Sequence, residues 1–283
     1  MFPSFEIFGK TFGLYAICAV LGVLLIGFLL SRRVKKQGYD ENDAILFILA
    51  LALGVVVGGS ILYAITNLHL LPKLFSAKSL KEAWQILESL FGGSVFYGGL
   101  IGGAIAGFVF VKINKLDRVF YMDSMAALIP LFHAIARVGC FLGGCCYGIE
   151  SSFGFTAHGN PYSPAVNDVR RFPVQLLESL GNLLIFVILQ WLFSQIWSKK
   201  NASAPAFVKK LKGRLLPVYM LLYPILRFSD EFLRGDEIRG FVFGGALSTS
   251  QFISILMFVG GVTWLLITAK KSTKNNSDAA TTA

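Results

Sequence analysis

The amino-acid sequence predicts an all-α, polytopic membrane protein with about seven transmembrane helices. Hydrophobic residues make up 55% of the 283 residues and charged residues only 15%, a balance far from that of a soluble domain. The mean hydropathy is +0.65. Seven apolar runs are long enough to cross a hydrocarbon core of about 30 Å, and they cover residues 12–30, 44–65, 94–111, 119–139, 174–193, 215–232 and 247–268.

The remaining segments complete the predicted architecture. The first run is expected to be a retained helix rather than a cleaved signal peptide, because only one cation, Lys10, precedes it and it ends directly in Arg32 and Arg33. Residues 79–91 mix polar and apolar side chains at helical spacing, which predicts a short amphipathic helix on the outer membrane interface. Residues 1–269 are therefore expected to form one transmembrane domain, and the polar residues 270–283 a disordered cytoplasmic tail.

The distribution of lysine and arginine predicts the orientation of the chain. With the amino terminus outside, the cytoplasmic loops contain about twice as many of these cations as the outer segments do. The cytoplasmic clusters lie at residues 32–36, 112–118, 199–214 and 270–274. We therefore expect the amino terminus outside and the carboxyl terminus in the cytoplasm. The excess cations then face anionic inner-leaflet lipid, so the net charge of +10 needs no nucleic-acid partner.

Ionisable side chains interrupt the apolar runs. They are Asp123, His133, Arg137, Glu178, Arg227, Asp230 and Glu231. A charge at the centre of a membrane helix costs about 2.5 to 3.5 kcal/mol by insertion measurements, so it usually persists for function. On the predicted topology, polar residues of five helices reach the outer ends of those helices, Gln251 at the start of the last run among them. We therefore expect one polar site open to the outer leaflet.

Two interpretations fit the arginines. Arg227 and Glu231 are four residues apart, and Glu231 and Arg234 three apart, so on a helix they share a face. They could form a self-neutralising ion cluster at a helix end. Alternatively, a planar guanidinium binds a phosphate through two hydrogen bonds. Arg137 has no acid within four residues in sequence, which favours a phospholipid head-group site.

Glycines and cysteines punctuate two of the helices. Small residues four apart, such as Gly54 and Gly58, indicate close helix packing. Gly98, Gly99 and Gly102 have the same small size and could in addition give a lipid room to enter. Residues 139–148 are too rich in glycine to continue a straight helix and are expected to turn.

The cysteines of this turn, Cys140, Cys145 and Cys146, leave several roles open. Small buried residues in a tight bend, a disulfide at an oxidising exterior and a catalytic thiol near Arg137 are all compatible with the pattern. A zinc site would require a fourth ligand, which His133 could supply only if the chain folded back. We therefore expect no metal and no cofactor.

The ordered motifs of the chain resemble those of bacterial prolipoprotein diacylglyceryl transferases. The resembling segments are 96–102 (Phe-Tyr-Gly-Gly-Leu-Ile-Gly), Asp123, 136–145 (Ala-Arg-Val-Gly-Cys-Phe-Leu-Gly-Gly-Cys), 171–178 (Arg-Phe-Pro-Val-Gln-Leu-Leu-Glu), 223–234 (Tyr-Pro-Ile-Leu-Arg-Phe-Ser-Asp-Glu-Phe-Leu-Arg) and 247–251 (Leu-Ser-Thr-Ser-Gln). The resemblance implies a seven-helix enzyme of the bacterial inner (plasma) membrane. That enzyme transfers diacylglycerol from phosphatidylglycerol to the cysteine thiol of a lipobox-containing lipoprotein precursor.

The resemblance and the residue patterns together predict roles for single residues. Arg137, Arg227 and Glu231, with Tyr97, are the expected catalytic residues, and the phosphate-facing arginines would neutralise the leaving group. The expected substrate-binding residues are Gly98, Gly99, Gly102, Arg234, Glu178 and Gln251. Cys140, Cys145 and Cys146 are expected to be structural or redox residues.

The chain also departs from the motifs that it resembles. Tyr97 stands where those motifs have histidine, and Cys140, Gly143 and Cys145 stand where they have two asparagines and a glutamate. A protein that binds or moves phospholipid without transferring it, or one that acts on another acceptor, is therefore the alternative function.

Overall fold

Helices coincide with each of the predicted apolar runs. The computed structural model describes residues 4–7, 10–93, 95–161, 163–198, 205–236 and 240–281. The long helices are α1 (Leu14–Gln37), α2 (Glu41–Thr66), α5 (Phe96–Ile113), α6 (Arg118–Gly143), α7 (Val174–Trp197), α9 (Leu215–Asp230) and α10 (Thr249–Thr281). Five of them are long and apolar enough to span a membrane: α1, α2, α6, α7 and the Thr249–Lys270 part of α10. The protein is therefore mostly helical and polytopic, and α5 and α9 are shorter helices beside the spanning ones.

Short elements connect these helices. The short helices are η1 (Leu68–Leu70), α3 (Leu71–Phe75), α4 (Leu80–Phe91), η2 (Pro164–Val166), α8 (Ala206–Lys209), η3 (Glu231–Leu233) and η5 (Phe243–Gly245). Three small antiparallel sheets pair β1 (Ser4–Ile7) with β2 (Lys10–Gly13), β3 (Glu150–Thr156) with β4 (Arg170–Arg171), and β5 (Phe241–Val242) with β6 (Leu247–Ser248). The all-α prediction missed these sheets, because strands of two to seven residues in loops leave no clear alternation in the sequence.

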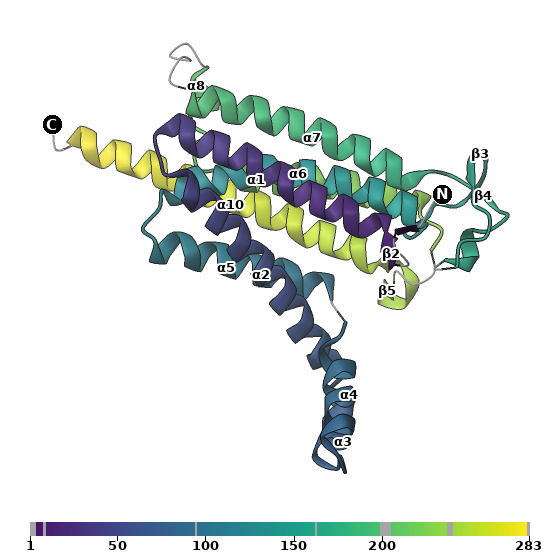
Figure 1. Cartoon of the computed structure of the whole chain (residues 1–283). Coiled ribbons are helices and arrows are strands. Elements are labelled where there is room, and N and C mark those ends of the chain that lie inside the picture. Colours follow the sequence, from purple (N-terminus) through teal and green to yellow (C-terminus); the bar gives the residue numbers. More distant parts are fainter. Residues whose placement is uncertain are drawn as a thin grey trace. The chain divides into compact units, whose positions relative to one another are not determined.

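Two compact units divide the chain, residues 27–121 and residues 1–26 with 122–283. In the first unit, α2 and α5 lie side by side (Figure 1). A Cβ atom on Gly98 would collide with the carbonyl oxygen of Gly58, and one on Gly102 with the carbonyl oxygen of Gly54. The glycines therefore allow the two backbones to touch, as predicted. This contact accounts for the small size of Gly98 and Gly102, and their role in substrate binding stays a prediction.

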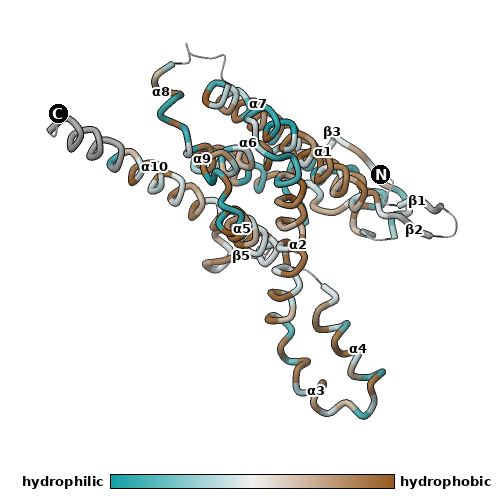
Figure 2. Tube along the Cα trace, turned by 60° about the vertical axis from the view of Figure 1, so that its left-hand side comes forward, coloured by the Kyte–Doolittle hydropathy of each residue, from teal (hydrophilic) through white to brown (hydrophobic). Residues whose placement is uncertain are grey.

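The predicted amphipathic helix is confirmed as α4. Its N-cap is Ser79, whose hydroxyl accepts a hydrogen bond from the backbone amide of Glu82. Apolar and polar residues alternate around α4, whereas α2 is hydrophobic along most of its length (Figure 2). Leu80 and Trp84 are exposed. The location of α4 on the outer membrane interface stays a prediction.

The second unit contains α6, α7, α9 and α10 with the first half of α1. Asp123, in the second turn of α6, is fully buried and accepts hydrogen bonds from the indole of Trp197 and from the backbone amides of Gly213 and Leu215. It therefore holds the start of α9, and it lies at the opposite end of that helix from Arg227. His133 lies in the middle of α6, with Nδ1 3.0 Å from the hydroxyl of Tyr219.

Two helices, α6 and α10, end later in the chain than the sequence predicted. α6 continues through Cys140 to Gly143 before the predicted turn, where Gly144 has a φ of 78°. The backbone of α10 continues past the expected boundary at residue 270 to Thr281. The disordered tail at 270–283 and the orientation of the chain in the membrane stay predictions.

Candidate functional site

Arg137 on α6 and Glu178 on α7 form an ion pair between two helices. Nε of Arg137 lies 2.9 Å from Oε1 of Glu178, and the glutamate side chain is only 2% exposed. Arg137 has no acid within four residues in sequence, and its partner comes from another helix. Two buried charges each lose several kcal/mol of hydration. The pair therefore fixes the register of α6 against α7.

Arg227 connects the end of α9 to α10. One terminal nitrogen of its guanidinium lies 2.6 Å from Oε2 of Glu231, and the other donates a hydrogen bond of 2.7 Å to the hydroxyl of Ser250. The four-residue spacing of Arg227 and Glu231 thus predicted their contact correctly. Ser250 belongs to the polar start of the last predicted apolar run, although no role was predicted for it individually.

Arg234 lies beyond the helix that was expected to carry it. α9 ends at Asp230, η3 ends at Leu233, and Arg234 has extended backbone angles. Its Nε and a terminal nitrogen donate hydrogen bonds to the two carboxylate oxygens of Asp236, and each of these bonds is 2.6 Å long. The face predicted for Glu231 and Arg234 therefore stops where the helix stops. Asp236 was missed, although an acid two residues from an arginine in a loop is a readable sign of such a pair.

Asp230 is the centre of this charge cluster. It is 3% exposed, and within the described residues its Oδ2 has no hydrogen-bond donor. The charges of Arg137, Arg227, Arg234 and Glu178 act on it. The three arginines share the cluster with four acids, namely Glu178, Asp230, Glu231 and Asp236. The cluster is therefore close to neutral without a ligand, as the self-neutralising interpretation requires.

Gln251 contributes to the start of α10. Its side-chain Oε1 accepts a hydrogen bond of 3.0 Å from the backbone amide of Ser248, and its backbone amide donates one of 3.1 Å to the hydroxyl of Ser248. This reciprocal pair is a capping box, which the Ser-x-x-Gln spacing could have predicted. The cap explains Gln251 structurally, and substrate binding by Gln251 stays a prediction.

The three cysteines of the 139–148 turn form a cluster. Their Sγ atoms all lie within 4.8 Å of one another. Cys140 is buried in the last turn of α6, Cys146 is half-buried and Cys145 is exposed. A terminal nitrogen of Arg137 lies 3.8 Å from the sulfur of Cys140. Hydrogen bonds from the other two thiols lower the pKa of Cys146, and the charges of Arg234 and Arg137 lower it further.

The backbone around these cysteines is held from several sides. The side-chain amide of Asn160 donates a hydrogen bond to the carbonyl oxygen of Gly143. A Cβ atom on Gly144 would collide with the nitrogen of this amide. The side-chain amide of Gln175 on α7 donates a hydrogen bond of 2.9 Å to the carbonyl oxygen of Cys145. Cys146 itself has a φ of 56°, a left-handed conformation that is uncommon outside glycine. Such a conformation persists only where surrounding contacts enforce it.

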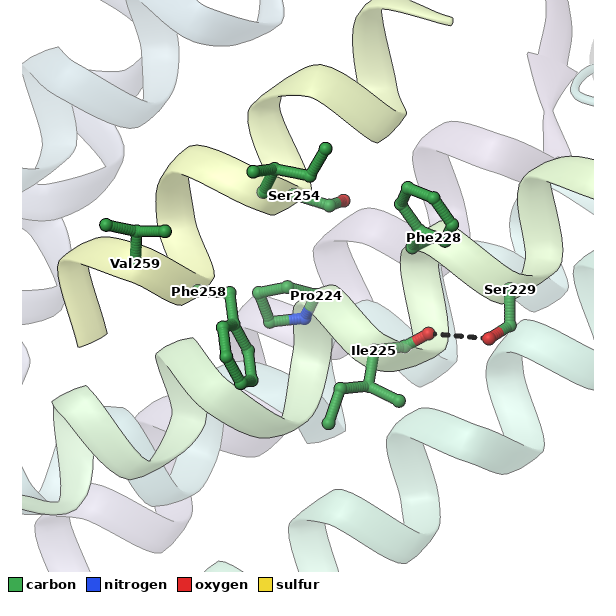
Figure 3. Close-up of a pocket in the computed structure, with 8 residues that line it drawn as sticks. Pro224, Ile225, Phe228, Ser229, Ser254, Phe258 and Val259 are labelled. Carbon is green, nitrogen blue, oxygen red and sulfur yellow. Dashed lines mark hydrogen bonds between the residues drawn. The ribbon is translucent and has the colours of Figure 1, made fainter. Parts of the chain in front are cut away.

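An apolar groove of about 270 Å³ lies between α9 and α10 (Figure 3). Its lining residues are Pro224, Ile225, Phe228, Ser229, Ser254, Ile255, Phe258 and Val259. The hydroxyl of Ser229 is bonded to the carbonyl oxygen of Ile225, so this polar group is satisfied within the helix. Phe228 directly follows Arg227, and Ser254 is one helical turn from Ser250. Two residues of the lining are therefore near Arg227 and Ser250 in the sequence of the same two helices.

Comparison with known proteins identifies the family. The family described as prolipoprotein diacylglyceryl transferase matches residues 4–267. The chain belongs to this family. It is 33% identical to the phosphatidylglycerol–prolipoprotein diacylglyceryl transferase of Clostridium tetani, over 91% of this chain and 94% of that protein. It is 32% identical to the second such enzyme of Clostridium perfringens and 33% identical to that of Finegoldia magna, each over at least 92% of both chains.

The family motifs can now be placed on the structure. In this member of the prolipoprotein diacylglyceryl transferase family, the charged site residues lie around Asp230 in the second unit. They are Arg137, Arg227, Arg234, Glu178 and Glu231. The substituted motif 139–148 lies beside them through the contact of Arg137 with Cys140. Tyr97, which is 37% exposed, belongs to α5 in the first unit, and its catalytic role stays a prediction.

One residue near the cluster was missed from the sequence. Tyr15, at the start of α1, packs on α6. A Cβ atom on Gly139 would lie 3.3 Å from the Cα of Tyr15, and a Cβ atom on Gly143 would lie 4.0 Å from its Cβ. The charges of Cys140, Cys145 and Arg137 act on its phenol. The two glycines, four residues apart on α6, are the signal that could have indicated a large neighbour on this face.

Proposed function

We propose that this chain transfers the diacylglyceryl group from phosphatidylglycerol to the cysteine thiol of an exported prolipoprotein. The observation that carries the proposal is the gathering of Arg137, Arg227 and Arg234 around the buried Asp230 in a chain of this family. The proposed location is a bacterial inner (plasma) membrane, with seven helices, the amino terminus outside and the site open to the outer leaflet.

The reaction requires two things of the protein. A thiolate must attack the diacylglyceryl carbon while the bond from this carbon to the phosphate oxygen breaks, so the site must stabilise the departing phosphate and remove one proton. A guanidinium has five N–H donors, and a single carboxylate does not use all of them. A phosphate can therefore share Arg137 and Arg227 with Glu178 and Glu231 rather than expel the acids. Arg234 would bind the same head group by exchanging its bond to Asp236.

The groove between α9 and α10 supports a diacylglyceryl substrate. Its lining is apolar apart from two hydroxyls bonded to their own helices, Ser229 and Ser254. A lipid whose phosphate reaches Arg227 can place an acyl chain along Phe228 and Phe258. Each buried CH₂ group contributes about 0.8 kcal/mol, so even half of an acyl chain gives substantial binding energy.

The direct test is transfer by the purified protein in vesicles that contain phosphatidylglycerol. A lipobox peptide should gain a diacylglyceryl thioether, and glycerol phosphate should be released in equal amount. Arg227→Ala should reduce this transfer by two orders of magnitude or more, the scale of losing a donor to a developing charge, roughly 3 kcal/mol. Arg32→Ala, which removes an exposed arginine of α1, is the matched control and should leave transfer unchanged. Absence of lipidated peptide with the folded wild-type protein would exclude the proposal.

The alternative is a protein that binds or moves phospholipid without transferring it, or one that acts on another acceptor. The observation that favours it is the replacement of the expected histidine, amides and carboxylate by Tyr97, Cys140, Gly143 and Cys145. In that case the protein would bind phosphatidylglycerol in an Arg227-dependent manner but leave the lipobox peptide unmodified. Complementation of a strain that lacks its own transferase separates the two functions in cells.

A further inference from the structure

The cysteine cluster has the composition of an open metal site. Zinc takes thiolate ligands at about 2.3 Å, so in a tetrahedral site the sulfurs lie about 3.8 Å apart. The three Sγ atoms of Cys140, Cys145 and Cys146 lie within 4.8 Å of one another, so a small contraction completes the geometry. Among the described residues no histidine, aspartate or glutamate joins this group. Three protein ligands with one open position are the pattern of catalytic rather than structural zinc.

The surroundings of the cluster suit such a site. Asn160 and Gln175 fix the backbone on either side of Gly144, and Cys146 is held in a left-handed conformation, so the ligand positions are pre-organised. Three thiolates and a divalent cation carry one net negative charge, which the guanidinium of Arg137 faces across 3.8 Å. Because Cys145 is exposed while Cys140 is buried, the site opens on the side of Cys145.

We propose that Cys140, Cys145 and Cys146 bind a thiophilic divalent cation such as Zn²⁺, whose open position takes the thiol of the acceptor cysteine. This role rests on the proposed transfer function. It also changes the sequence expectation of no metal, which assumed that a site needs four protein ligands. The fourth ligand is here the substrate.

The cation would favour loss of the acceptor thiol's proton where the expected acid–base side chains are missing. A thiol that coordinates a metal loses its proton, here to water, and is held as a thiolate. The thiolate sulfur then forms a bond to the diacylglyceryl carbon, and the carbon–oxygen bond to phosphate breaks. The electron pair of that bond leaves on glycerol phosphate, and Arg137 stabilises its negative charge. The thioether is a weak ligand and departs, so the metal undergoes no redox change and is regenerated.

Metal content tests the site without reference to activity. The protein is purified in detergent under reducing conditions, treated with a chelator, loaded with Zn²⁺ and freed of unbound ions before its zinc is measured by mass spectrometry. The wild-type protein should keep a single Zn²⁺ per chain, and so should Cys18→Ser, the matched control, since Cys18 lies outside the cluster. Cys145→Ser and Cys146→Ser should lose it. Because Cys145 is exposed, its variant is the one expected to fold normally, which circular dichroism verifies.

Two results would overturn the site. One is a wild-type protein that keeps no stoichiometric zinc, or serine variants that keep as much as the wild type. The other is a disulfide between any two of the three cysteines, found by mass spectrometry in protein taken from membranes before any reduction.

Cobalt reports the role of the open position. In Co²⁺-loaded protein, a lipobox peptide should change the thiolate-to-cobalt absorption, and the same peptide with serine in place of cysteine should not. Removal of the metal should lower transfer roughly tenfold or more, with recovery on adding Zn²⁺. Full transfer by metal-free protein would overturn the inference and leave the proposed function standing. A cobalt response to the cysteine peptide without any transfer would instead support the metal site and reject the proposed function.

Discussion

At the scale of single residues, each arginine of the candidate site has an acid beside it. Arg137 pairs with Glu178, Arg227 with Glu231, and Arg234 with Asp236. Pairing of this kind makes charges tolerable in a membrane protein, because an unpaired buried charge costs far more than the pair. It also means that loss of one arginine has two consequences, a lost ligand contact and an unpaired buried acid. Variants must separate the two.

The pair of Arg137 and Glu178 allows this separation. Arg137→Ala should lower the free energy of unfolding by about 3 to 5 kcal/mol, because it leaves Glu178 buried without a partner. Arg137→Met combined with Glu178→Leu should recover most of this loss, since both charges are gone. Thermal unfolding in detergent measures the stabilities, and the vesicle assay measures transfer.

The double variant decides between structure and function. If Arg137 binds the phosphate, the stable double variant should remain inactive, and Arg137→Lys should restore little transfer because lysine lacks the planar fork. Transfer at the wild-type rate in the stable double variant would assign Arg137 a purely structural role.

At the scale of elements, the start of α10 positions a contact of the site. Ser248 and Gln251 cap this helix reciprocally, and Ser250 between them receives the hydrogen bond of Arg227. A cap fixes the first turn, so it also fixes the hydroxyl that meets the guanidinium. The capping pair is thus expected to affect both stability and transfer.

Removing either half of the cap should show the coupling. Ser248→Ala or Gln251→Ala should each cost about 1 kcal/mol of stability. The double variant should cost less than the sum of the two, because both single changes break the same reciprocal pair. Thermal unfolding of the three variants forms the cycle. Strict additivity would contradict a reciprocal cap.

The contact of α2 with α5 depends on glycine in the same way. Gly102→Ala should destabilise the protein by about 1 to 3 kcal/mol, because the added methyl group meets the carbonyl oxygen of Gly54 and the helices must separate. Gly27→Ala is the matched control in the same unit, as the nearest side-chain atom to its Cβ is 3.8 Å away. Equal stability of the two variants in detergent would show that α2 and α5 do not touch as described.

At the scale of the whole molecule, the placement of the cations predicts a testable topology. Reporter fusions after Arg33, Arg118 and Lys212 should read as cytoplasmic, and a fusion within residues 155–167 should read as external. This arrangement brings the ends of α6 and α9 that carry Arg137 and Arg227 to the outer leaflet. A reversed pattern of reporter signals would place them on the cytoplasmic side and exclude an extracytoplasmic acceptor.

The sequence by itself determined the long helices of this protein. Apolar runs had to become helices, because a backbone in lipid must satisfy its own hydrogen bonds. Local sequence patterns likewise predicted a turn within residues 139–148, the helix α4 and the contact of Arg227 with Glu231. All of these depend on residues within a few positions of one another, where geometry follows directly from the helix.

Only the tertiary structure decided which distant residues meet. The partner of Arg137 comes from α7, the partners of Asp123 come from the start of α9 and the end of α7, and Tyr15 packs on the glycines of α6. Arg234 left the predicted face because the helix ended before it. The spacing of the cysteines did not predict three sulfurs within 4.8 Å, since a left-handed residue after the helix brings them together. Contacts between distant segments depend on how helices pack, and a sequence pattern that is local carries no record of that packing.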